Sequence, residues 1–209
     1  MAKSIDYVLF DWDGCLARTM HLLLRALKTE LGKQDLRLTD KQVIRYMFGN
    51  WLGGLRYWGV ADAEETVVKI KEEYDKKKGE VKLYAGVKET LRRLVKRGKR
   101  LGVIKLEGDG NEIRPLLGIE SVQIFTGRDL AGEKPEAKVL ERAVELLGGR
   151  KAETLWVGNS VNDLEMGRGA GVETVIFCPA ENEKFGNSKI LEAEGVRVIG
   201  EFRELLKIV

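Results

Sequence analysis

The sequence predicts an α/β fold, in which a mainly parallel sheet carries helices on both faces and a separate all-helical domain is inserted. Two observations lead to this prediction. Short apolar runs alternate with helical patterns through most of the 209 residues, which is the order of elements typical of an open α/β sheet. Between residues 17 and 82 this alternation stops, and every pattern reads as a helix.

Six short apolar runs are predicted to be the strands of the sheet. They lie at residues 5–10, 100–105, 121–125, 154–159, 173–178 and 196–200. Several are rich in Val and Ile, as is typical of parallel strands that are buried on both faces. Between them, residues 86–97 and 136–147 place their Val and Leu side chains on one side of a helix, and a shorter helix is expected over 163–170.

The segment from 17 to 82 is predicted to be a second, helical domain. Its helical patterns cover residues 21–31, 39–48 and 61–78, with Thr39 or Asp40 and Asp62 as candidate N-caps. The chain would leave the sheet just past Leu16 and return to it near residues 81–86. We therefore predict an α/β core formed by residues 1–16 and 83–209, and a helical cap domain formed by residues 17–82.

The composition excludes several classes of protein. A formal net charge of +3 gives no basis for a nucleic-acid or membrane partner, because both favour clustered basic charge. Cys15 and Cys178 lie far apart and form no CxxC pair, so neither a disulfide framework nor a thiolate zinc site is expected. The single histidine, His21, argues against histidine-rich zinc hydrolases and a Ser-His-Asp triad.

The same composition bears on where the protein works. The N-terminal residues contain no apolar signal stretch, and no run of the chain approaches transmembrane length. We therefore expect a soluble, cytoplasmic protein. Charged residues make up 33% of the chain, with Lys and Glu dominant, and this pattern is typical of proteins from thermophiles.

Charged and polar side chains follow several of the predicted strands. Asp11 and Asp13 follow the first run and Lys105 ends the second. Lys134 lies in the loop beyond the third, and Asn159 and Asp163 follow the fourth. In open α/β sheets the active site lies beyond the carboxyl ends of the strands, so we expect these residues to lie near one another.

Converging carboxylates with lysines indicate a hard cation and an anionic substrate. Mg²⁺ prefers oxygen ligands and typically binds through one or two carboxylates, water and substrate phosphate. A carboxylate can also act as a nucleophile and form an aspartyl-phosphate, while a second carboxylate protonates the leaving oxygen and then activates water. Gly14 would allow a sharp turn directly after the two aspartates.

Three motifs resemble those of the haloacid dehalogenase superfamily of phosphohydrolases. The sequence FDWDGCL at 10–16 resembles the first motif, usually D-x-D-G-[TV]-L. GEKP at 132–135 resembles the third, in which a lysine precedes proline, and VGNSVNDLEM at 157–166 resembles the fourth, G-D-x-x-x-D followed by a helix. Three motifs in order, each at a predicted strand end, are far more specific than one. The resemblance covers essentially the whole chain and implies a Rossmann-like core with a helical type-1 cap, as in phosphoglycolate phosphatase-like members.

The resemblance implies a role for each matching residue. Asp11 would be the nucleophile and a magnesium ligand. Asp13 would be the general acid/base, with its backbone oxygen on the metal. Lys134 would bind the phosphate and shield the charge of Asp11. Asp163 would anchor the metal loop and belong, with Asp11, Asp13 and Asn159, to the magnesium site. Dehalogenases of the superfamily generally lack the second aspartate, so Asp13 favours phosphate chemistry over cleavage of a carbon–halogen bond.

Two positions depart from the family pattern. The second motif normally ends in Ser or Thr, where this chain has Lys105, and the fourth normally has an acid where this chain has Asn159. Both changes are expected to make the site more positive. Asn159 could still ligate magnesium through its amide oxygen, and Lys105 could bind phosphate as a point charge, although a strand-end lysine can equally turn into solvent.

We therefore expect a magnesium-dependent phosphatase that hydrolyses a small phosphorylated metabolite through an aspartyl-phosphate. A sugar phosphomutase shares the same motifs and is an alternative. A phosphate-ligand binding protein with weakened catalysis is another, because Asn159 and Lys105 depart from the pattern. The sequence identifies neither the substrate nor the oligomeric state.

Overall fold

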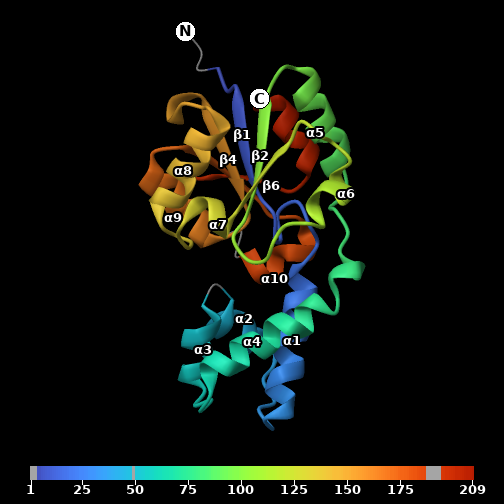
Figure 1. Ribbon diagram of the computed structural model, residues 1–209, viewed down its shortest axis with the longest axis vertical. Helices are drawn as coiled ribbons and strands as arrows, with labels where there is room; N and C mark the ends of the chain where they lie inside the picture. The colour runs from blue at the N-terminus through green and yellow to red at the C-terminus, as the bar shows by residue number, and fades with distance from the viewer. Residues whose placement is uncertain (1–3, 49, 187–193) are drawn as a thin grey trace. The chain divides into compact units, whose positions relative to one another are not determined.

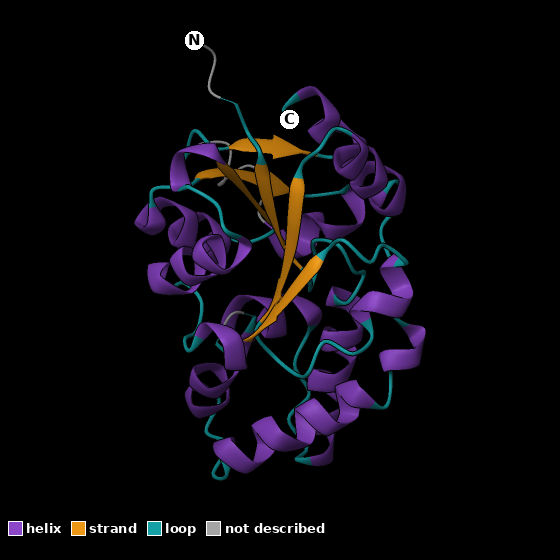
Figure 2. Ribbon diagram, turned by 45° about the horizontal axis from the view of Figure 1, so that its top comes forward, coloured by secondary structure: helices purple, strands orange, loops and turns teal. Residues whose placement is uncertain are grey.

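The protein is described by a computed structural model over residues 4–48, 50–186 and 194–209. The chain divides into two compact units. One consists of Met1–Ala17 together with Leu83–Val209, and the other of Arg18–Lys82. In the described part of the chain, the strands belong to the first unit, while the second contains helices and loops (Figure 2).

The first unit contains a six-stranded parallel sheet. Its strands are β1 (Tyr7–Asp11), β2 (Arg100–Lys105), β3 (Gln123–Thr126), β4 (Thr154–Gly158), β5 (Glu173–Phe177) and β6 (Arg197–Ile199). They are ordered β3-β2-β1-β4-β5-β6, and each neighbouring pair is parallel. The strand order reverses between β1 and β4, which is where open α/β sheets bind their ligands. The predicted fold class is confirmed, and each of the six predicted runs overlaps a strand.

Helices cover both faces of this sheet. The described helices of this unit are α5 (Val87–Lys96), α6 (Ile113–Leu117), α7 (Gly127–Leu130), α8 (Ala137–Leu147), α9 (Val161–Ala170) and α10 (Glu183–Gly186), with 3₁₀ turns η2 (Lys151–Glu153), η3 (Ala180–Asn182) and η4 (Phe202–Lys207). In Figure 1, α8 and α9 lie on one side of the strands and α5 on the other. Because parallel strands buried on both faces need apolar residues throughout, this layering explains the unbroken apolar runs of the sequence.

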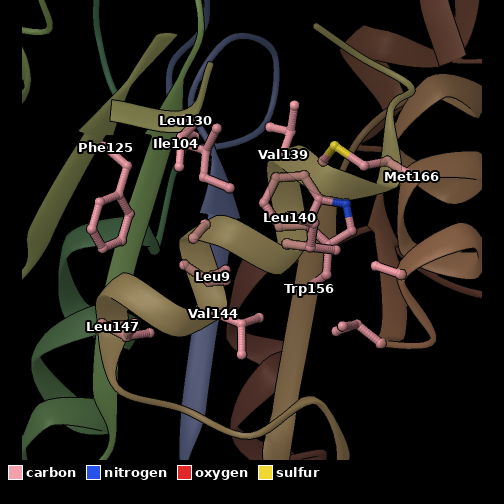
Figure 3. Close-up of a cluster of buried hydrophobic side chains, with 13 residues drawn as sticks. Leu9, Ile104, Phe125, Leu130, Val139, Leu140, Val144, Leu147, Trp156 and Met166 are labelled. Atoms are coloured by element: carbon pink, nitrogen blue, oxygen red, sulfur yellow. The ribbon is translucent and has the colours of Figure 1, made fainter. Parts of the chain in front are cut away.

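One face of the sheet packs on α8 and α9 through a cluster of buried side chains. It includes Leu9 and Ile104 from the strands, Leu140 from α8 and Met166 from α9, around the indole of Trp156 (Figure 3). Phe10, the neighbour of Leu9, is fully buried on the other face, where its ring lies 5.8 Å from that of Phe202. Fully burying one such side chain contributes about 1.5–3 kcal/mol, so β1 is anchored from both sides.

The second unit is helical. It contains α1 (Met20–Lys33), α2 (Asp40–Met47), α3 (Trp51–Tyr57), α4 (Ala63–Asp75) and the 3₁₀ turn η1 (Lys78–Glu80). Thr39 caps α2 in a capping box with Gln42, whereas Asp62 precedes α4 without a side-chain capping bond. Of the two candidate N-cap sites, only the one at Thr39 uses its side chain in this way.

Candidate active site

The main chain at the end of β1 places Asp11 and Asp13 at the carboxyl edge of the sheet. Asp11 is the last residue of β1 and is buried. The N–H groups of Cys15, Leu16 and Ala17 all lie within hydrogen-bond distance of the Trp12 carbonyl oxygen, so the chain turns tightly past Asp13. Gly14 has φ 81° in this turn, a left-handed conformation that a residue with a Cβ adopts only at a cost.

Two buried polar side chains stabilise this turn through hydrogen bonds. The Asn182 side-chain amide donates to the Gly14 carbonyl oxygen at 3.0 Å, and the Tyr84 hydroxyl donates to Asn182 Oδ1 at 2.8 Å. Asn182 and Tyr84 are both buried. The backbone around Asp13 is therefore held by two side chains that lie far from it in the sequence and that no sequence pattern connects with it.

Lys134 joins two carboxylates. Its Nζ lies 2.6 Å from Asp11 Oδ1 and 2.7 Å from Asp163 Oδ1. Burial alone would lower the pKa of Lys134, but the two carboxylates raise it, so this lysine stays a cation. Burial raises the pKa of Asp11 to about 7; Lys134 opposes this shift, while the Asp163 carboxylate adds to it.

Asp163 organises the loop between β4 and α9. Its Oδ2 accepts hydrogen bonds from the backbone N–H groups of Asn159 and Ser160, both at 3.0 Å, and from the Ser160 hydroxyl at 2.6 Å. The indole of Trp156 donates to the Asp163 carbonyl oxygen at 3.1 Å. Although burial opposes it, Lys134 and these donors hold the pKa of Asp163 below its usual value, so its carboxylate is ionised at neutral pH.

Asn159 faces two oxygen atoms of the first motif. With its Nδ2 on that side, the amide donates to Asp11 Oδ2 at 3.0 Å and to the Asp13 carbonyl oxygen at 3.1 Å. Turning the amide over would instead present Oδ1 beside those two oxygens. Three oxygen atoms would then lie beside the Asn159 amide, and oxygen is the ligand type that Mg²⁺ prefers.

These residues fit a magnesium site of limited charge. Within the described ranges, no group of three or more His, Cys, Asp or Glu side chains is arranged to hold a metal ion. The donors near Asn159 instead combine one carboxylate, one main-chain oxygen and one amide. Both oxygens of Asp163 already contact Lys134 or the loop donors, so its geometry is that of a residue that holds the loop rather than of a direct ligand.

Lys105 turns inward and is nearly fully buried. Its Nζ lies 3.2 Å from Asp13 Oδ2 and 3.2 Å from Glu112 Oε1. Burial alone would lower the pKa of Lys105, but Asp13 and Glu112 outweigh it and raise the pKa. Lys105 thus adds a buried cation next to Asp13, and the carboxylate of Glu112 beside it offsets part of that charge.

The structure thus brings all six predicted residues into one network of contacts. Lys134 links Asp11 to Asp163, Asn159 links Asp11 to Asp13, and Lys105 links Asp13 to Glu112. The sequence reasoning missed Glu112 and Ser160. A capping-box pattern, Ser160 followed three residues later by Asp163, could have identified Ser160, whereas no local pattern points to Glu112.

The matches to known proteins identify the family of this chain. The chain matches the haloacid dehalogenase-like hydrolase family over residues 8–177, and it therefore belongs to that family, as predicted. It is 28% identical to pyrophosphatase PpaX of Listeria innocua over 92% of this chain and 94% of the relative. It is 30% identical to phosphoglycolate phosphatase of Rhodospirillum rubrum over 81% of this chain and 78% of the relative. The names of these relatives agree with the predicted enzyme class, a phosphatase.

Solved structures share the fold. A hydrolase from Pseudomonas syringae superposes with a TM-score of 0.80 at 21% identity, covering 96% of each chain. CbbY from Rhodobacter sphaeroides, solved in complex with phosphate, superposes with a TM-score of 0.77 at 20% identity, also over 96% of each chain. In the described residues of the present chain, no helix has the length and apolar character needed to cross a membrane.

Proposed function

We propose that this protein is a magnesium-dependent phosphatase that hydrolyses a small phosphorylated metabolite through an aspartyl-phosphate on Asp11. The observation that supports this most is the pairing of Asp11 with Lys134 at the end of β1, at 2.6 Å, beside Asp13. A nucleophilic carboxylate, a neighbouring acid/base and a fixed cation are the groups that such a two-step transfer requires.

In the first step, an Asp11 carboxylate oxygen forms a bond to phosphorus while the bond from phosphorus to the leaving oxygen breaks. Asp13, in its protonated form, gives its proton to that leaving oxygen. In the second step, Asp13 takes a proton from water, whose oxygen attacks the phosphorus and releases inorganic phosphate, and Asp11 is regenerated. Lys134 offsets negative charge on Asp11 and on the phosphoryl oxygens throughout.

Magnesium would be held by Asp11, by the main-chain oxygen of Asp13 and by the amide oxygen of Asn159, and bound there it would offset and orient the phosphoryl oxygens. Asp163 would keep the Asn159 loop in place. Residues 18–82 would serve as the cap that selects the substrate and excludes water. We infer a cytoplasmic location from the sequence, which has two cysteines far apart and no disulfide framework.

The test is hydrolysis of p-nitrophenyl phosphate with and without added Mg²⁺, followed by a panel of small phosphorylated compounds. Inorganic pyrophosphate and 2-phosphoglycolate come first, because relatives of this chain are named for them. Asp11→Asn is the inactive control. Release of phosphate that needs both Mg²⁺ and Asp11 supports the proposal. Isomerisation of a sugar phosphate without net release indicates a mutase, and phosphate binding without turnover on any compound indicates a binding protein.

A further inference from the structure

A group of three charged side chains, one buried and two partly buried, lies beside the proposed nucleophile. It consists of Lys105 at the end of β2, Asp13 after β1 and Glu112 just before α6, all within the α/β unit. The side chain of Lys105 is 2% exposed, that of Glu112 15% and that of Asp13 28%. The ammonium is thus the most buried member, with one carboxylate on each of two different segments.

Two carboxylates rather than one make Lys105 a fixed cation. A lysine ammonium is a point charge on a flexible stem with three donors, and a single partner would leave it free to follow that partner. Here Nζ lies 3.2 Å from an oxygen of each carboxylate. Because Glu112 is the less exposed of the two, it is the partner that an incoming anion displaces less readily.

We propose that Glu112 is a positioning residue that holds Lys105 as a phosphate-binding cation, and that a phosphate oxygen replaces Asp13, and not Glu112, on the Lys105 ammonium. This inference rests on the proposed function only in that the site must admit phosphate. Asp13 would then be released from Lys105 when substrate arrives, and its carboxyl group could turn to the leaving oxygen.

A positioning role and simple charge repulsion predict opposite effects of Glu112→Gln on phosphate affinity. Glu112 is an anion near a site for an anion, so repulsion alone predicts that Glu112→Gln tightens phosphate binding. If Glu112 acts by holding Lys105, the same variant loosens the cation and weakens binding. In a chain that lacks the Lys105 ammonium, only the repulsion remains, so Glu112→Gln should then tighten binding or leave it unchanged.

The experiment is a double-mutant cycle on binding of inorganic phosphate by isothermal titration calorimetry, without divalent metal. Its variants are Glu112→Gln, Lys105→Met and the pair together, with Lys105→Gln as the second choice if the Met variant unfolds in a thermal scan. Glu120→Gln is the matched control, because Glu120 is an exposed glutamate on the same segment that pairs with Arg114. We expect Glu112→Gln to weaken phosphate binding roughly 3- to 10-fold in the parent chain only.

Each other result overturns the inference. Tighter or unchanged binding in Glu112→Gln would mean that Glu112 acts through repulsion or not at all. If Glu112→Gln weakens phosphate binding equally with and without Lys105, Glu112 acts on the fold and not through Lys105. If the parent chain binds no phosphate, Lys105 is not a phosphate-binding cation. This experiment measures binding and not turnover. A chain that binds phosphate as expected, but hydrolyses nothing in the separate phosphatase assay, contradicts the proposed function and leaves this inference standing.

Discussion

Asn159 occupies the position at which the family pattern has an acid, and its amide contacts both Asp11 and the Asp13 carbonyl oxygen. In the orientation that donates two hydrogen bonds, the amide stabilises the site without a cation. Binding a cation requires the amide to turn over, which gives up both hydrogen bonds. Metal binding at this site therefore competes with these two hydrogen bonds. The site also has one negative charge fewer than the family pattern.

Asn159→Asp should tighten Mg²⁺ binding on the order of tenfold or more, because it adds a charge directly beside the cation in a partly desolvated site. The measurement is calorimetric titration with Mg²⁺, or Mg²⁺ dependence of turnover. Asn162→Asp is the matched control, since it adds the same charge on the first turn of α9. Should Asn159→Asp leave the affinity unchanged, Asn159 is not a ligand.

Asp11→Asn should abolish turnover and should also change how stability depends on pH. Burial raises the pKa of Asp11 to about 7, so the folded protein binds a proton there more tightly than the unfolded chain, whose carboxyl titrates near 3.8. Ionising Asp11 therefore costs stability, progressively as pH rises from about 4 to 7, by about 1.4 kcal/mol per pKa unit at most.

The Asn variant lacks this cost. We expect its thermal midpoint, without divalent metal, to exceed that of the parent above pH 7 and to approach it near pH 4. Asp35→Asn, at an exposed position in the helical unit, is the control and should show no such pH-dependent gain. A gain for Asp11→Asn that is the same at pH 4 and pH 8 would argue against a raised pKa.

At the level of elements, the end of β4 and the start of α9 depend on each other through Asp163. Ser160 and Asp163 cap α9 reciprocally, and the Asp163 carboxylate passes close to the backbone of Gly158, where β4 ends. A Cβ at Gly158 would overlap Asp163 Cβ and would lie 2.5 Å from its Cγ. The helix cap and the site carboxylate therefore both depend on glycine at this position.

Gly158→Ala should displace Asp163, loosen Lys134 and reduce turnover strongly, and should lower the free energy of unfolding by about 1–3 kcal/mol. Gly32→Ala in α1 is the matched control. A Cβ there meets nothing within 4 Å, so this substitution should stabilise the protein by about 0.5–1 kcal/mol. Urea unfolding of both variants measures these changes. Equal stability of the Gly158 variant and the parent would show that Asp163 can move without cost.

Across the whole molecule, the sequence predicted what repeats locally and missed what forms only through tertiary contact. Buried parallel strands require apolar runs, so all six strands could be located, and Asp11, Asn159 and Lys134 could be expected beyond their ends. The inward direction of the Lys105 side chain could not be predicted, because the direction of a side chain at a strand end depends on which residues lie near it in the fold. Glu112 lies in an irregular segment seven residues along the chain from Lys105, and only the folded core brings their charges together.

The α/β unit is expected to fold without the helical unit, because its two chain ends at the insertion already lie side by side. Ala17 and Leu83 form an isolated antiparallel bridge, and the Tyr84 N–H donates to the Leu16 carbonyl oxygen at 3.0 Å. A tight turn of about two to four residues can therefore replace residues 18–82, since such turns join antiparallel neighbours without strain. The hydrophobic cluster around Trp156 lies wholly within this unit, so its core stays intact.

We therefore expect the shortened chain to unfold cooperatively in a thermal scan and to bind inorganic phosphate, because Asp11, Lys105 and Lys134 all belong to the remaining unit. Its turnover should fall and its preference within the panel of phosphorylated compounds should change, because water and substrates would enter without selection by a cap. The parent chain measured on the same panel is the control. A shortened chain that is unfolded, with no cooperative transition, would mean that the helical unit completes the core. A folded one with an unchanged substrate preference would mean that residues 18–82 do not act as a cap.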